Sequence, residues 1–235
     1  MRLEPAGGRQ GLLFILTVIP VGCGIENHST SNLLIFSDTA TRGVAQVKHI
    51  TLIQGHPDPQ GGHFCHALAD AYLRGAAQSG HAIQVIDVAQ LEFPLLRSRA
   101  EFHGGPVPDD IAQAQSALAD AEHLVFIYPI WMGTMPALLK GFLEQAFRPG
   151  FAVNELGKGV LKGKSARIVV TMAMPALIYR WYYRAHGLRS FEHNILGFAG
   201  IGPMRENLIG MVEGMNDAAR QKWVHKMEKQ GRAGC

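Results

Sequence analysis

The amino-acid sequence predicts an α/β fold built around a doubly wound sheet of five parallel strands. Five short apolar runs, rich in β-branched residues, lie between residues 47 and 235. Three of them are almost continuously apolar, as strands covered on both faces are. Segments with helical periodicity separate the runs, and such alternation requires right-handed crossovers and therefore a parallel sheet. The chain has 235 residues, 47% hydrophobic and 17% charged, which is enough to bury one sizeable core.

The five predicted strands are short and apolar. They are residues 49–54 (HITLIQ), 82–87 (AIQVID), 123–128 (HLVFIY), 167–172 (RIVVTM) and 204–211 (MRENLIGM). Five strands suit the flavodoxin-like order 2-1-3-4-5, in which ligands bind beyond the carboxyl ends of the first and third strands. We therefore expect the chemistry of this protein at residues 55–65, 129–133 and 171–186.

Five further segments show apolar residues at helical spacing, with start or stop signals at their ends. The first begins near Phe64 and stops at Gly80, the second starts at Pro108, the third has Thr134 as its N-cap and Pro136 in its first turn, the fourth runs over 188–198 and stops at Gly200, and the fifth starts at Asn216. Two irregular stretches, 91–107 and 151–165, are long enough to be lids or dimer contacts.

Charge and cysteine content exclude several classes of protein. The 22 Lys and Arg residues against 19 Asp and Glu leave a net charge of only +3, and the basic residues do not cluster, so we expect no nucleic-acid partner. The three cysteines, Cys23, Cys65 and Cys235, are scattered and odd in number. They make no disulfide framework and indicate a reducing, cytoplasmic compartment.

Residues 1–46 form an N-terminal extension with three interpretations. The apolar run 11–21 has about half of the roughly 20 residues that span a bilayer, so we expect no stable membrane insertion. With Arg2 and Arg9 before it and Cys23 after it, the run resembles a lipoprotein signal, which would make a lipid-anchored protein. We favour an upstream start codon chosen in error, with residues 47–235 as the folded domain. A disordered extension is the third interpretation.

The loop after the first predicted strand, residues 55–65 (GHPDPQGGHFC), is a candidate phosphate-binding loop. Its glycines leave backbone N–H groups free to converge, and the following helix N-terminus adds a favourable dipole. It matches neither the dinucleotide-binding glycine motif nor the P-loop, so an ordinary strand-to-helix turn is the alternative. His56, His63, Cys65 and His66 fit no recognised ligand spacing, and we predict no metal site.

Two more loops carry candidate binding residues. Residues 129–133 (PIWMG) form an apolar loop that suits a flat heterocycle, with a buried turn around a core Trp131 as the alternative. The fourth predicted strand is followed by a cluster of aromatic side chains with interleaved arginines, which is typical of an interface or a substrate wall. The cluster comprises Tyr179, Trp181, Tyr182 and Tyr183 with Arg180, Arg184 and His186.

Four blocks of the sequence resemble the NAD(P)H:quinone oxidoreductases of flavodoxin-like fold, the group of modulator of drug activity B and DT-diaphorase. The blocks are GHPDP…F, YPIWMGTMPALLKGFLEQAF, LKGKSARIVVTMAMP and HNILGFAGIGPMRENLIGMVEG, and the likeness covers about residues 48–230. It implies a homodimer with a tightly held flavin, usually FAD with FMN as the alternative, and ping-pong transfer of two electrons from NAD(P)H to a small-molecule quinone. The alternative function is a regulatory flavin-binding subunit of a potassium-efflux transporter.

The resemblance also implies the site residues. Those that match cofactor-binding positions are His56, His63, Phe64 and Cys65 in the first loop, Pro129, Ile130, Trp131, Met132 and Gly133 in the second, and Thr171, Met172, Ala173 and Met174 in the third. His63 and Cys65 stand where the family often has Ser and Asn, so backbone contacts are expected there. Tyr179 and His186 match a pair credited with stabilising the reduced flavin. Their spacing is one residue wider than in the mammalian enzyme, which leaves Tyr182 or Tyr183 as the alternative tyrosine.

Overall fold

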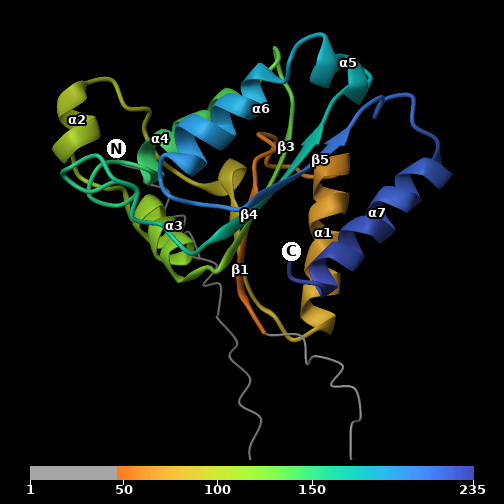
Figure 1. The fold of residues 1–235 in the computed structure, drawn as a ribbon, viewed down its shortest axis with the longest axis horizontal. Coiled ribbons are helices and arrows are strands. Elements are labelled where there is room, and N and C mark those ends of the chain that lie inside the picture. The colour runs from red at the N-terminus through yellow and green to blue at the C-terminus, as the bar shows by residue number, and fades with distance from the viewer. Residues whose placement is uncertain (1–46) are drawn as a thin grey trace, which may run out of the picture. The chain divides into compact units, whose positions relative to one another are not determined.

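A sheet of five parallel strands forms the centre of the computed structural model, which describes residues 47–235 (Figure 1). The strands are β1 (His49–Gln54), β2 (Ala82–Asp87), β3 (His123–Pro129), β4 (Ser165–Thr171) and β5 (Met204–Ile209). Their order is β2-β1-β3-β4-β5, and every neighbouring pair is parallel. The predicted fold class and strand order are confirmed. The predicted extension, residues 1–46, lies outside the described residues.

The strand boundaries follow burial and backbone conformation. Every residue from His123 to Tyr128 of β3 is buried, because helices cover both faces of this central strand. Strand β5 ends at Ile209, two residues before the predicted end at Met211. Met211 has a φ of 58°, a left-handed conformation that no strand continues.

Helices cover the two faces of the sheet in two layers (Figure 1). One layer is α1 (Phe64–Gln78) and α7 (Asp217–Arg232), and the other is α3 (Asp109–Asp120), α4 (Ala137–Ala146), α6 (His186–Ser190) and the π-helical segment η2 (Phe191–Gly197). The backbones of α1 and α7 touch, since a Cβ on Gly75 would lie 1.9 Å from the carbonyl oxygen of Glu228. Glycine is therefore required at this crossing.

The sequence-based helix predictions were wrong in three places. Thr134 is not an N-cap, because its backbone pairs with Trp131 in a tight turn and α4 begins after Pro136. The predicted helix over 188–198 is instead α6 followed by the π-helical η2. The stretch 91–107 is not wholly irregular, since it contains α2 (Arg99–Gly104), which is capped by the Ser98 hydroxyl. The short helices α5 (Ala176–Trp181) and η1 (Val88–Gln90) were also missed.

Candidate functional site

The three predicted loops meet at the carboxyl edge of the sheet. The N–H of Ile130, at the end of β3, donates to the carbonyl oxygen of Thr171 at the end of β4 over 2.8 Å. The Sγ of Cys65, in the first turn of α1, lies 3.2 Å from the Thr171 hydroxyl. The hydroxyl of Tyr179 donates to the carbonyl oxygen of Gly133 over 3.4 Å. Residues distant in the sequence therefore form one continuous surface, as the parallel topology requires.

The first loop presents free backbone donors at the start of α1. Gly61 and Gly62 adopt left-handed conformations with φ values of 73° and 77°, which bring the chain into the helix. Among the described residues, the N–H groups of Phe64 and Cys65 have no protein acceptor. The positive end of the helix dipole lies at the same place, so this terminus favours an anion.

Three imidazole rings cluster beside these donors, and two of them stack. The ring centroids of His56 and His63 are 4.0 Å apart with an interplanar angle of 17°, and His66 lies 5.1 Å from His56. The His63 Nε2 is 2.7 Å from an oxygen of Asp58, and the hydrogen bond from His63 lowers the pKa of that carboxyl. Burial, followed by the neighbouring His63 and His66, lowers the pKa of His56 to about 4. His56 is therefore neutral at pH 7 in the free protein.

Two polar donors in this loop lack partners. The Nδ1 of His66 accepts the N–H of His63 over 3.3 Å, so a neutral His66 carries its proton on Nε2. That Nε2 is buried and unpartnered within residues 47–235, as is the amide nitrogen of Gln54 at the end of β1. Buried donors without acceptors are costly and indicate a missing acceptor group. Sequence reasoning did not consider Gln54 and considered His66 only as a metal ligand, although His66 lies three positions after the N-cap His63, the spacing of a capping box.

The side chains of Cys65 and Thr171 contact each other and are not exposed to a ligand. Both side chains are buried, and burial raises the pKa of the Cys65 thiol to about 12. The thiol stays protonated at neutral pH and is no nucleophile. In the third loop the N–H of Met172 donates to Ile209, which leaves the N–H groups of Ala173 and Met174 as the donors without a protein acceptor in the described chain.

The second loop is a tight exposed turn. The backbones of Trp131 and Thr134 exchange hydrogen bonds of 2.9 and 3.1 Å. Met132 and Gly133 between them are both left-handed, as the central residues of a type I′ turn are. Trp131 is 52% exposed and Met132 is fully exposed, so the alternative of a buried turn around a core Trp131 is wrong. An exposed indole and thioether are available to a flat ligand.

The connection after β4 holds this turn in place. Tyr179, in α5, is buried, and its hydroxyl accepts the N–H of Leu188 over 3.2 Å while donating to Gly133. A Cβ on Gly187 would lie 2.5 Å from the Gly133 carbonyl oxygen, so α6 packs directly on the turn. His186 is exposed and makes no hydrogen bond to the described part of the chain. The ring of Tyr182 packs edge-on against Tyr183, and both tyrosines are exposed.

Backbone strain concentrates at the same edge of the sheet. Among residues 47–235, the non-glycine residues with positive φ are Met132, Arg184, Ala185 and Met211. All four lie in connections that follow β3, β4 or β5. Left-handed conformations cost such residues about 1–2 kcal/mol each and cluster at functional sites. The strain independently marks the carboxyl edge as the candidate site.

A family model described as a flavodoxin-like fold matches residues 48–230. The chain belongs to this family. An uncharacterised NAD(P)H oxidoreductase of Haemophilus influenzae is 25% identical over 168 residues, covering 68% of this chain and 83% of that protein. The solved NAD(P)H:quinone oxidoreductase of Methanothermobacter marburgensis superposes with a TM-score of 0.69 at 22% identity, over 80% of this chain and 96% of that one. The relatives of this flavodoxin-like protein therefore include NAD(P)H oxidoreductases.

A shorter match involves a transporter subunit. The glutathione-regulated potassium-efflux system ancillary protein KefG of Escherichia coli O6:K15:H31 is 36% identical over 88 residues. The match covers 35% of this chain and 48% of KefG. This similarity is local and does not extend over the whole flavodoxin-like domain.

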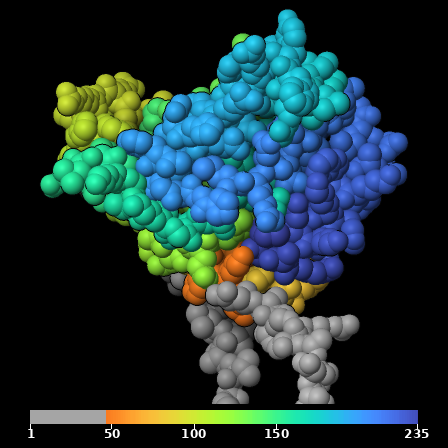
Figure 2. Space-filling model, in the orientation of Figure 1, coloured from red at the N-terminus to blue at the C-terminus, as the bar shows by residue number. Residues whose placement is uncertain are grey.

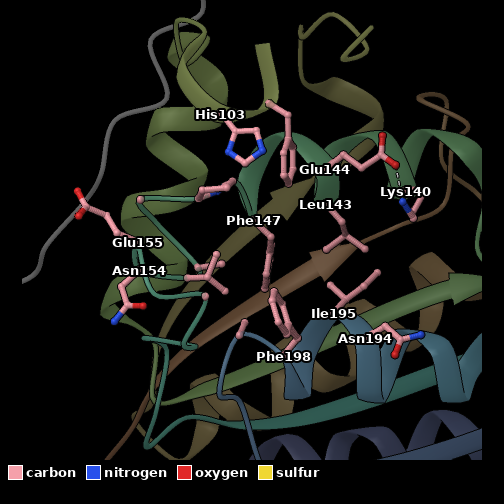
Figure 3. A pocket seen from close by; sticks show the side chains of 17 residues that line it. His103, Lys140, Leu143, Glu144, Phe147, Asn154, Glu155, Asn194, Ile195 and Phe198 are labelled. Carbon is pink, nitrogen blue, oxygen red and sulfur yellow. Dashed lines mark hydrogen bonds and ion pairs between the residues drawn. The ribbon is translucent and has the colours of Figure 1, made fainter. Parts of the chain in front are cut away.

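A cavity of about 780 Å³ lies apart from the three loops (Figure 3). It is enclosed by α2, the second half of α4, the stretch 149–157 and η2. Phe147 of α4 and Phe198 after η2 extend toward each other across it (Figure 3). None of the predicted site residues of this flavodoxin-like protein lines the cavity.

Two other features are absent from residues 47–235 of the flavodoxin-like chain. No helix within residues 47–235 is long and apolar enough to cross a membrane. In the same residues, no group of three or more His, Cys, Asp or Glu side chains is placed to hold a metal ion. The cluster of His56, His63 and His66 is therefore not a metal site by this criterion.

Proposed function

We propose that this protein is a flavin-dependent NAD(P)H:quinone oxidoreductase with its cofactor at the carboxyl edge of the sheet. The observation that carries the proposal is the set of unpartnered donors in the first loop, beside an exposed apolar turn from the second. Anionic phosphate and a flat apolar ring are the two parts of a flavin, and the two loops suit one part each. The membership in the flavodoxin-like family and the named NAD(P)H oxidoreductase relatives support the same function.

The first loop fits the phosphate end of the cofactor. The N–H groups of Phe64 and Cys65 and the Nε2 of His66 are donors that need acceptors, and phosphate oxygens supply them. His56 and His63 lie beside these donors, and the ring of His63 is hydrogen-bonded to Asp58. We propose FAD as the cofactor, with FMN as the alternative that identification of the released flavin would decide.

The second and third loops fit the ring. Trp131 and Met132 offer apolar contact, while the N–H groups of Ala173 and Met174 are free to meet the polar edge of a heterocycle. When bound, the flavin supplies the redox chemistry, taking two electrons from NAD(P)H and passing them to a quinone in a ping-pong sequence. The protein residues bind and orient the ring and exclude water from it.

Tyr179 and His186 are proposed to support the reduced cofactor. The Tyr179 hydroxyl is buried between Gly133 and Leu188, so this residue fixes the position of the turn that holds the ring. His186 is exposed and free to approach negative charge on the ring. Tyr182 and Tyr183 are the exposed alternatives for a tyrosine that contacts the ring directly.

We further propose that the protein is a cytoplasmic homodimer that associates through the cavity face. The two stretches expected to be lids or dimer contacts, 91–107 and 151–165, each contribute residues to the lining of this cavity. Phe198 at its rim is 55% exposed, and a concave apolar face is typical of an interface.

The second candidate function is a regulatory flavin-binding subunit of a potassium-efflux transporter. The local identity to KefG favours it, as does the exposed apolar surface of α5. Both functions require flavin, but only the enzyme catalyses repeated oxidation of NAD(P)H by a quinone. The test is oxidation of NADPH and NADH by the flavin-loaded protein with a water-soluble benzoquinone. Quinone-dependent oxidation is expected, and flavin binding without turnover would replace the enzyme by the regulatory subunit.

A further inference from the structure

Helix α5 and the two residues after it expose an unusual set of side chains. Leu177, Ile178, Trp181, Tyr182 and Tyr183 are exposed by 71, 46, 75, 79 and 51%. We call these five residues the α5 patch. Within the helix, Tyr179 is the residue whose side chain is buried. Five large apolar or aromatic side chains on so short a segment exceed the scattered exposure that is normal for a protein surface.

The fold makes this segment project from the carboxyl edge of the sheet. Arg184 and Ala185 are consecutive left-handed residues, with φ values of 55° and 47°, and they turn the chain back into α6. Figure 2 shows the segment in cyan, protruding at the top of the molecule. The exposed Met132 lies in the turn that Tyr179 contacts, and the exposed Met211 donates its N–H to Met174, just before α5. The α5 patch is thus the tip of a wider apolar edge.

The segment that carries the patch has basic residues and no acidic ones, although Glu192 and Glu206 lie beside it and interact with Arg180. From residue 176 to residue 191 the chain has no Asp or Glu, but it has Arg180, Arg184 and Arg189. Arg180 forms an ion pair with Glu206 of β5. Arg184 and Arg189 are exposed and form no ion pair with any described residue. A partner of this surface must therefore accept apolar and aromatic side chains, and negative charge on that partner would meet Arg184 and Arg189.

We propose that the α5 patch is a peripheral docking surface for lipid bilayers with anionic headgroups. Trp and Tyr are the side chains that settle at the interface between headgroups and acyl chains, because one end is apolar and the other is polar. Leu177 and Ile178 add apolar area, and the arginines beside them meet lipid phosphates. Two arginines and a small apolar area give reversible binding that needs anionic lipid.

A second copy of the chain fits this surface less well. If the two-fold axis of a dimer passed through this patch, the arginines of each copy would meet arginines, with no acidic residue of the 176–191 segment between them. A stable protein interface also buries about 800 Å² on each partner, which is a large area for a helix of six residues. Charge complementarity therefore favours the bilayer over self-association.

Docking of the α5 patch to a bilayer does not depend on the proposed function, but it would bring the proposed flavin site close to the membrane. The patch adjoins the turn of Trp131 and Met132, where the flavin ring is proposed to lie. Docking through α5 would place that edge of the sheet against the bilayer, where quinones with long apolar chains are dissolved. Electron acceptors could then reach the site without crossing water.

The test is sedimentation of the full chain with vesicles. Wild-type protein is expected to sediment with vesicles of phosphatidylcholine mixed with phosphatidylglycerol, and much less with phosphatidylcholine alone or at high salt. The double variant Trp181→Ser/Tyr182→Ser should bind the anionic vesicles at least about tenfold more weakly. Arg184→Gln and Arg189→Gln should each weaken binding by about fivefold. Trp181 fluorescence should shift to the blue with anionic vesicles, and Trp181→Phe should lose that shift.

Controls separate the patch from other surfaces. Val85 is 52% exposed on the edge strand β2, three strands away from the β4 strand that precedes α5, and Val85→Ser should leave vesicle binding unchanged. Circular dichroism should show that every variant keeps its fold. Equal vesicle binding by wild type and the double variant would overturn the proposal and assign the binding to another segment. Absence of vesicle binding would overturn it as well. If light scattering then showed a wild-type dimer that the double variant lacks, the surface would be a dimer interface.

Discussion

Gly187→Ala tests whether α6 positions the turn that is proposed to hold the flavin ring. Gly187 does not require a positive φ, so alanine causes no intrinsic backbone strain there. The added Cβ would lie 2.5 Å from the carbonyl oxygen of Gly133 and 2.8 Å from the Cα of Thr134. Both atoms belong to the backbone of the turn. The methyl group therefore has no flexible side chain to push aside.

The size of the effect follows from this geometry. Ordinary contacts begin near 3.4 Å, so Gly133 and α6 must separate by about 0.9 Å (3.4 − 2.5). Overpacking of this kind costs about 1–3 kcal/mol. The turn is exposed and has fewer neighbours to resist it than the core side of α6, so we expect the turn to move. If this full free energy must be spent to return the turn to the position that binds flavin, flavin affinity falls by about 5- to 150-fold.

The assay is titration of flavin into apoprotein, followed by quenching of flavin fluorescence. Gly187→Ala should raise the dissociation constant by the factor above, and thermal unfolding of the apoprotein should show a smaller change. Gly214→Ala is the matched control, because a Cβ there would meet no atom within 4 Å. Unchanged flavin affinity in Gly187→Ala, together with a lowered melting temperature, would refute the reasoning and place the ring away from this turn.

Four further predictions address single residues. His66→Ala removes the buried unpartnered donor, and calorimetry should show flavin binding weaker by about ten- to a hundredfold, whereas an unchanged affinity would exclude a phosphate at Nε2. Tyr179→Phe and His186→Ala should slow flavin reduction by NAD(P)H on the order of 10- to 1,000-fold in stopped flow with protein saturated by added flavin, and unaffected rates in both would transfer the role to another tyrosine. Burial lowers the pKa of His123 to about 3, so below pH 6.5 the unfolded chain takes up a proton that the folded chain does not. The free energy of unfolding should therefore fall by about 2 kcal/mol between pH 6.5 and 5, and urea titrations of His123→Gln should show this dependence reduced. Phe198→Glu should dissociate the proposed dimer in light scattering, and a dimer that persists would move the interface elsewhere.

The sheet and the meeting of the three candidate loops at one edge could be predicted from the sequence. Strand β1 has the predicted boundaries, because a buried parallel strand reads as an apolar run bounded by polar residues. The edge strand β2, which is only partly buried, also has the predicted boundaries. Since parallel strands share a carboxyl edge, the three loops after β1, β3 and β4 had to meet there. Their contacts through Thr171 and Gly133 follow from this topology.

The details of the loops could not be predicted. A left-handed Met132 has no sequence signature, so the turn that replaces the expected Thr134 cap was not foreseen. Helix α5 has six residues, fewer than two turns, and its periodicity is too short to recognise. The close approach of Gly187 to the turn depends on two segments more than 50 residues apart, and no local pattern records it.

The most direct test of the account is the absorption spectrum of the purified protein, followed by identification of the flavin released on denaturation. The account predicts yellow protein with close to one flavin per chain, bleached by NAD(P)H and restored by a quinone. Colourless protein that also fails to take up added FAD or FMN would contradict the central claim that the three loops form a flavin site.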